Sequence, residues 1–161
     1  MTHCRLSIEY EGMVKRRELY AKYGIAAEAA QLFETELGTI LLALRALAEG
    51  WHSMPNPAAA QELLTTIDKS TLGRMLNKVR ENLKVNAELD QILQSGVEAR
   101  NKLSHGFFAK HNYRIQNEDG RAEMVEELGR LLLDFFGAGQ AASAISSLLT
   151  ERILGGHIKP E

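Results

Sequence analysis

The sequence predicts an all-α protein, a single-domain antiparallel bundle of about five helices over residues 1–161. Apolar residues recur at three- and four-residue steps in four segments, which is the pattern of amphipathic helices. No segment alternates apolar and polar residues as a half-buried strand does. With 45% hydrophobic residues and three prolines, the composition is that of a compact domain that folds without disulfides or a structural metal.

The clearest predicted helix covers residues 25–48, where apolar side chains repeat at helical spacing along the whole segment. The preceding segment, residues 9–23, is charged and contains tyrosines, and Gly24 separates it from the helix. We therefore expect residues 1–24 to form a peripheral arm or a shorter helix of their own.

Three further helices are predicted in the middle of the chain. Asn56-Pro57 is a cap followed by proline at the first helical position, and it predicts a helix through about Ile67. Ser70 is the expected cap of the next helix, whose apolar stripe lies within residues 72–79. A longer helix is expected from about Ala87 to Phe108.

The last part of the chain is predicted to be a polar connection followed by a long helix. The connection covers residues 109–120 and ends in a turn signal at Asp119-Gly120. Helical spacing resumes at Arg121, and we expect the Gly137-Ala138-Gly139 segment to kink or split this helix. The tail, residues 155–161, is expected to be peripheral.

Charge and termini restrict the functional classes. The formal net charge is −2, which argues against a general nucleic-acid coat protein but leaves room for a local basic site. Cys4 is the only cysteine, which fits a reducing compartment. The N-terminal residues lack the pattern of a signal peptide, and no apolar run is long enough to span a membrane. We therefore expect a cytoplasmic protein that does not enter a membrane.

Arg100 is the most informative residue of the sequence. On a helical projection it lies at the centre of an apolar stripe formed by Leu89, Leu93, Val97, Leu103 and Phe107. A guanidinium among apolar neighbours needs a partner, because burying an unpaired charge is strongly unfavourable. In one interpretation the head of Arg100 reaches a carboxylate such as Glu34 or Glu36. In the other it binds an anion.

Two polar residues next to Arg100 favour an anion site with proton-transfer chemistry. Asn101 and His105 lie one turn apart on the adjacent face of the helix. Imidazole exchanges protons near neutral pH, guanidinium holds a phosphate through two donors, and an amide can orient either group. Basic residues that would add an RNA-binding patch follow in the same helix and the connection: Lys102, Lys110, His111 and Arg114.

Other chemistries have weaker support. The sequence contains no phosphate-binding glycine loop, no HExxH zinc motif and no nucleophile elbow. His3 and Cys4 are adjacent at a terminus and make a poor metal site, so we expect neither a metal nor a cofactor. By default His52 and His157 are solvent-facing or hydrogen-bonded structural residues, a default that also applies to His111.

The segment GVEARNKLSHGFF, residues 96–108, resembles the signature segment of the HEPN superfamily. HEPN domains are helical bundles, and many are metal-independent ribonucleases of toxin–antitoxin, abortive-infection and RNA-processing systems. Their motif is an arginine, often followed by a polar residue, with a histidine four to six residues further on. Here the match is Arg100, Asn101 and His105. The resemblance covers this segment closely and the rest of the chain only as helical order.

The resemblance implies a homodimer whose two motif helices face each other across a composite cleft, with RNA as substrate and an antitoxin or regulatory protein as a possible partner. His105 would act as general acid or base, Arg100 would stabilise the phosphorane and Asn101 would position them. One position departs from the family: where some members carry a nucleotide-accepting tyrosine, this chain has Phe107. The alternatives are a noncatalytic HEPN-like dimeric adaptor or regulatory module, and a helical domain unrelated to the family.

Overall fold

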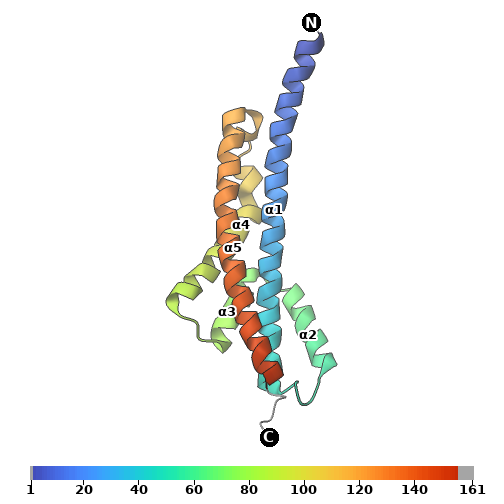
Figure 1. Ribbon diagram of the computed structural model, residues 1–161, viewed down its shortest axis with the longest axis vertical. Helices are drawn as coiled ribbons and strands as arrows, with labels where there is room; N and C mark the ends of the chain where they lie inside the picture. Colours follow the sequence, from blue (N-terminus) through green and yellow to red (C-terminus); the bar gives the residue numbers. More distant parts are fainter. Residues whose placement is uncertain (1, 156–161) are drawn as a thin grey trace.

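The computed structural model of the protein confirms the all-α helical bundle (Figure 1). It describes the backbone of residues 2–155 and the side chains of residues 16–155. The helices are α1 (Thr2–Glu49), α2 (Pro57–Asp68), α3 (Leu72–Asn82), α4 (Ala87–Lys110) and α5 (Glu118–Gly155), with a 3-10 turn, η1 (Arg114–Gln116), before α5. His157, the tail from residue 156 and the side chains of His3 and Cys4 lie outside the described residues.

Three long helices form the body of the bundle (Figure 1). α4 runs antiparallel to α1 and α5, since Arg100 meets Glu34 while Phe107 meets Tyr23 nearer the start of α1. α1 and α5 run in the same direction, because α2, α3 and α4 return the chain to the end where α1 begins. The antiparallel arrangement therefore holds for α4 against both neighbours but not for α1 against α5.

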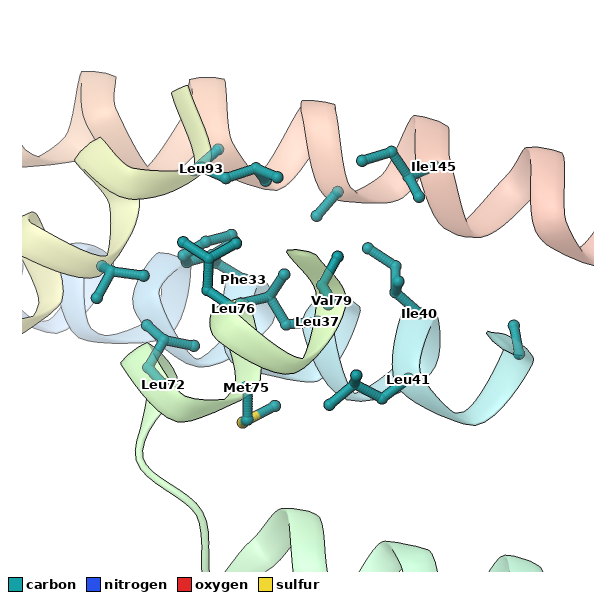
Figure 2. Packing of buried hydrophobic residues seen from close by; sticks show 14 of the residues in the cluster. Phe33, Leu37, Ile40, Leu41, Leu72, Met75, Leu76, Val79, Leu93 and Ile145 are labelled. Atoms are coloured by element: carbon teal, nitrogen blue, oxygen red, sulfur yellow. The ribbon is translucent and has the colours of Figure 1, made fainter. Parts of the chain in front are cut away.

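The apolar core consists of two clusters along this bundle. One lies where α3 packs against α1, α4 and the second half of α5, and Figure 2 shows Leu72, Leu76 and Val79 of α3 close to Phe33 and Leu37 of α1. The other lies toward the opposite end, where α1, α4 and the first half of α5 meet. α2 contributes no fully buried residue, and its main packing partner is α1.

The expected break at Gly24 is wrong, because α1 is one continuous helix of 48 residues. Leu19 is completely buried and Tyr23 packs against the second core cluster, so the apolar face of α1 extends through Gly24 without a change of partner. A glycine costs a helix interior about 1 kcal/mol, which tertiary packing on both sides outweighs. Residues 16–24 are therefore part of the bundle and not a separate arm.

The expected kink at Gly137-Ala138-Gly139 is also wrong, since α5 continues through it. Small residues serve close packing here. Ala138 is completely buried against α4 at Gly96, where an added Cβ would lie 2.4 Å from the Ala138 Cβ and 2.7 Å from the Phe33 ring. Only glycine at position 96 permits this approach of α4 to α5.

Polar side chains cap the starts of the helices as predicted, but two of the helices begin at other positions than predicted. Asn56 and Pro57 open α2 as predicted, with the Asn56 side chain accepting a hydrogen bond from the Ala59 amide at 3.1 Å. The cap of α3 is Thr71, because the Ser70 hydroxyl instead donates backwards to the Thr66 carbonyl at 2.7 Å.

The second shift moves the start of the last helix. The predicted turn at Asp119-Gly120 is the first turn of α5, since the Asn117 side chain accepts from the Gly120 amide at 2.7 Å and caps the helix three residues earlier than predicted. Gly120 is required there, because an added Cβ would lie 2.2 Å from the Arg114 carbonyl oxygen of η1.

Candidate functional site

Arg100 lies on α4 with its side chain 25% exposed and its head turned toward α1. Its Nη2 is 3.1 Å from Glu34 Oε1, so one of the two carboxylates expected from the sequence is its partner. The other, Glu36, instead accepts a hydrogen bond at 2.8 Å from the Ser146 hydroxyl of α5. The guanidinium therefore sits at the edge of the core, where it links α4 to α1 and still reaches solvent.

His105 is the second partner of Arg100. The distance from Arg100 Nη1 to His105 Nε2 is 3.4 Å, and the imidazole is exposed. Guanidinium can only donate, so a hydrogen bond in this pair uses the Nε2 lone pair, with the ring proton on Nδ1. That lone pair can accept a proton from a bound hydroxyl once the guanidinium turns to a phosphate.

Asn101 is exposed next to this pair, and its side chain makes no hydrogen bond to another described residue. Arg100, Asn101 and His105 thus lie together on one helix as the sequence predicts, with Arg100 and His105 in contact. A rigid helix holds all three at fixed spacing, which favours a preorganised site.

The predicted basic patch is not a continuous surface. Lys110 forms an ion pair with Glu127 at 3.0 Å, and Arg114 forms one with Glu123 at 2.8 Å. Lys102 is exposed and has no ion-pair partner among the described residues. Of the four residues predicted to form the patch, Lys102 is therefore the one that is exposed without an ion-pair partner among the described residues, whereas Lys110 and Arg114 are paired with carboxylates.

His111 does not reach the surface. Its side chain is 0% exposed, lies against the Phe107 ring at a tilt of 58° with ring centroids 5.0 Å apart, and places Nε2 2.8 Å from Glu127 Oε2. Burial alone would raise the pKa of Glu127, but the hydrogen bonds from Lys110 and His111 outweigh it and hold this pKa below its usual range. His111 is therefore absent from the exposed surface that was expected to bind RNA, and its burial agrees with the structural role that is the default for such a histidine.

Sequence reasoning missed a cavity beside Arg100. It has a volume of about 470 Å³ and lies between α1, α2 and α3, with Glu34 and Arg100 at one edge and Asp68 and Ser70 at another. The cavity depends on how α2 docks on α1, where Gly38 leaves room for Ile67: a Cβ on Gly38 would lie 3.3 Å from its Cγ2. Gly38 was the one available signal, because a glycine inside a helix often marks a close neighbour.

Two exposed aromatic residues lie one turn beyond His105. Phe108 is 37% exposed and Tyr20 of α1 is 52% exposed, with ring centroids 6.3 Å apart. Tyr23 fills the space beneath them, 4.8 Å from the Phe108 ring, and its hydroxyl donates to the Leu103 carbonyl at 3.5 Å. The α1–α4 surface thus presents, in order, the cavity, the Arg100–His105 pair and an aromatic cluster.

Comparison with models of known protein families, with characterised proteins and with solved structures found no match. Among the described residues, no group of three His, Cys, Asp or Glu side chains is arranged to hold a metal. α5 is long and apolar enough to cross a membrane by length and composition, a weak signal that core helices of bundles share. A proposal about the function of the protein therefore has to start from the geometry around Arg100.

Proposed function

We propose that the protein is a metal-independent endoribonuclease of the HEPN type, a toxin or defence component acting in the cytoplasm. The observation behind the proposal is the contact between Arg100 and His105, 3.4 Å apart on one face of α4. A guanidinium next to an exposed imidazole supplies the two groups that RNA transesterification needs: a cation for the phosphate and a base for the hydroxyl.

In the proposed reaction, the ribose 2′-oxygen attacks the adjacent phosphorus as His105 Nε2 accepts the 2′-hydroxyl proton. The bond from phosphorus to the 5′-oxygen then breaks, and the leaving oxygen takes up a proton from imidazolium or water. Arg100 stabilises the extra negative charge of the phosphorane, and Asn101 orients the phosphate or the imidazole. The products are a 2′,3′-cyclic phosphate and a 5′-hydroxyl end.

The surroundings of the pair favour single-stranded RNA over a duplex. Tyr20 and Phe108 offer exposed rings one turn from His105, and stacking of a base on an aromatic ring contributes about 1–3 kcal/mol. Lys102 is exposed two residues after Arg100 and adds a second cation on α4, which agrees with contact to the phosphates of one strand.

The proposed active form is a homodimer, and an exposed apolar groove supports it. The groove lies between α1 and α5 and contains Leu32 and Phe136, which are 62% and 55% exposed. Thr35 lines both this groove and the cavity beside Arg100, so a second copy seated on the groove would lie next to the cavity, on a face formed by α1 and α5 and not by the motif helix α4. Light scattering on the purified protein tests this, and a monomer at every accessible concentration contradicts it.

The test of the ribonuclease proposal is incubation of the protein with mixed RNA in EDTA, followed by analysis of the new ends. Wild-type protein is expected to leave cyclic phosphate and 5′-hydroxyl ends, and His105→Ala is expected to cleave two to four decades more slowly with its circular dichroism unchanged. Gln91→Ala is the matched control, since Gln91 is an exposed residue of the same helix that has no assigned part in binding or catalysis. Equal cleavage by wild type and His105→Ala contradicts the proposal.

A second candidate function is a noncatalytic HEPN-like adaptor or regulatory module. The Arg100–Glu34 ion pair favours it, because the same arginine also joins α4 to α1. In that case Arg100→Ala lowers the melting temperature by leaving Glu34 unpaired at the core edge, and His105→Ala changes nothing measured. Absence of cleavage by wild type on varied RNAs, together with this pattern, supports the adaptor.

A further inference from the structure

The cavity beside Arg100 has the size and composition of a ligand site. Its volume of about 470 Å³ falls within the range of small-molecule sites, roughly 300–1,000 Å³. One part of its wall is apolar, with Leu42, Leu64, Ile67 and Met75. The rest is polar, and these two kinds of wall suit a flat heterocycle with polar edges.

The polar wall offers hydrogen-bond acceptors almost exclusively. The hydroxyls of Thr35, Thr39 and Ser70 donate to backbone carbonyls of their own segments at 3.0, 3.0 and 2.7 Å, which leaves only their lone pairs for a ligand. Glu34 and Asp68 add carboxylates, and Asp68 has no ion-pair partner among the described residues. Arg100 is the one side-chain donor of the lining. A ligand that fits must therefore bring N–H groups of its own.

Guanine meets this requirement best among the four bases of RNA. Its Watson–Crick edge carries two adjacent donors, N1–H and the N2 amino group, which match the two oxygens of one carboxylate. Adenine and cytosine place a ring acceptor beside their amino group, and a carboxylate repels that acceptor. Uracil has one ring N–H between two carbonyls. The acceptor-rich wall thus discriminates against all three.

We propose that this cavity binds a guanine base, with Asp68 accepting the N1–H and N2–H donors and the apolar wall contacting the ring. Its catalytic consequence rests on the proposed ribonuclease function: because Arg100 borders both the cavity and His105, a guanine held there places its own phosphodiester at the Arg100–His105 pair. The protein then cleaves RNA next to guanosine.

The binding test uses nucleoside monophosphates and does not depend on cleavage. In calorimetric titrations wild type is expected to bind GMP at least about tenfold more tightly than AMP, CMP or UMP, because a bidentate contact discriminates among bases. Asp68→Asn is expected to remove this preference. Thr39→Trp fills the cavity from an exposed position of α1 and should abolish GMP binding. Glu62→Gln, an exposed carboxylate of α2 outside the lining, is the matched control.

The cleavage test sequences the ends produced from mixed RNA. Guanosine is expected next to the cut, and Asp68→Asn should lose this preference while retaining cleavage at other sites. Specific GMP binding without any cleavage leaves the guanine cavity in place and overturns the ribonuclease. Cleavage without guanosine preference, combined with equal binding of all four monophosphates, overturns the guanine cavity and leaves the ribonuclease. Failure of both tests overturns both.

Discussion

Two arginines of similar exposure have different surroundings in this bundle. Arg80 of α3 is 33% exposed and Arg100 of α4 is 25% exposed. Arg80 donates to Asp90 from Nε at 2.6 Å and from Nη2 at 3.0 Å. Its Nη2 also donates to Gln94 at 3.0 Å, and its Nη1 donates to Asn77 at 3.1 Å. Arg100 has one carboxylate contact at 3.1 Å and a long contact to His105 at 3.4 Å. The nitrogens of Arg80 all donate to neighbouring side chains, whereas Arg100 retains N–H donors for a ligand.

The histidines repeat the same contrast. His111 is buried and bonded to Glu127 at 2.8 Å, whereas His105 is exposed and faces a guanidinium. A carboxylate partner fixes His111 in place, and its absence at His105 leaves that imidazole able to exchange protons with a substrate. In both pairs the partners of a residue, and not its type, separate a structural role from a candidate catalytic one.

The largest expected effect is on cleavage by conservative arginine variants. Arg100→Lys keeps the charge but loses the planar pair of donors that fits a phosphate, so we expect cleavage to fall by about two decades or more. Arg80→Lys is expected to change the rate less than about twofold, since Arg80 contacts neither Arg100 nor His105. RNA cleavage assays on both variants check this, and equal loss of activity would erase the distinction between the two arginines.

The next effect is on stability, and it compares Gly96, which neighbouring side chains crowd, with Gly24, which has open space around it. Gly96→Ala is expected to lower the free energy of unfolding by about 1–3 kcal/mol, because neither Ala138 nor the Phe33 ring can move aside easily. Gly24→Ala should raise it by roughly 0.4–1 kcal/mol, because nothing lies within 4 Å of the added methyl group. Urea denaturation of the two variants measures both changes, and a stabilising Gly96→Ala would contradict the packing described at α4 and α5.

Glu127→Gln tests how firmly His111 is held. Near neutral pH we expect the variant to lose about 1–3 kcal/mol, because a buried imidazole and Lys110 both lose their anionic partner. The pKa of Glu127 is held below its usual value of about 4.5, so the stabilisation is complete above that pH and is lost as pH falls through the lowered pKa. Wild type and variant should therefore converge in stability under acid, as thermal melts from pH 3 to pH 7 would record.

The smallest effect is expected at Arg80 and Asp90. Their ion pair is partly exposed, and Asp90→Asn should cost no more than about 1 kcal/mol near neutral pH. The hydrogen bond from Arg80 holds the pKa of Asp90 below its usual range, so this contribution also disappears in acid. Melting temperatures of Asp90→Asn at two pH values measure it, and a loss that grows toward low pH would show the opposite sign.

The sequence allowed prediction of the helices wherever the controlling interaction is local. Caps such as Asn56 depend on residues within one turn, and the apolar stripes identify the faces that pack. The same stripes identified Arg100 as anomalous and Glu34 as one of two partners. Gly24 and Gly137–Gly139 misled because the energy that keeps their helices continuous comes from distant residues. The burial of His111 depends on its contact with α5, and the cavity depends on the docking of α2. Helical periodicity gives no information about contacts between helices.

The first and last helices of the chain form the most extensive contact of the fold. Glu36 bonds to Ser146 across 110 residues of sequence. During synthesis α1 leaves the ribosome long before α5 exists, so the face of α1 that α5 covers stays open until α5 emerges. Contacts so distant in sequence slow the folding of a helical protein relative to bundles of neighbouring helices. Synthesis of α5 therefore controls when the fold that positions Arg100 and Glu34 becomes stable.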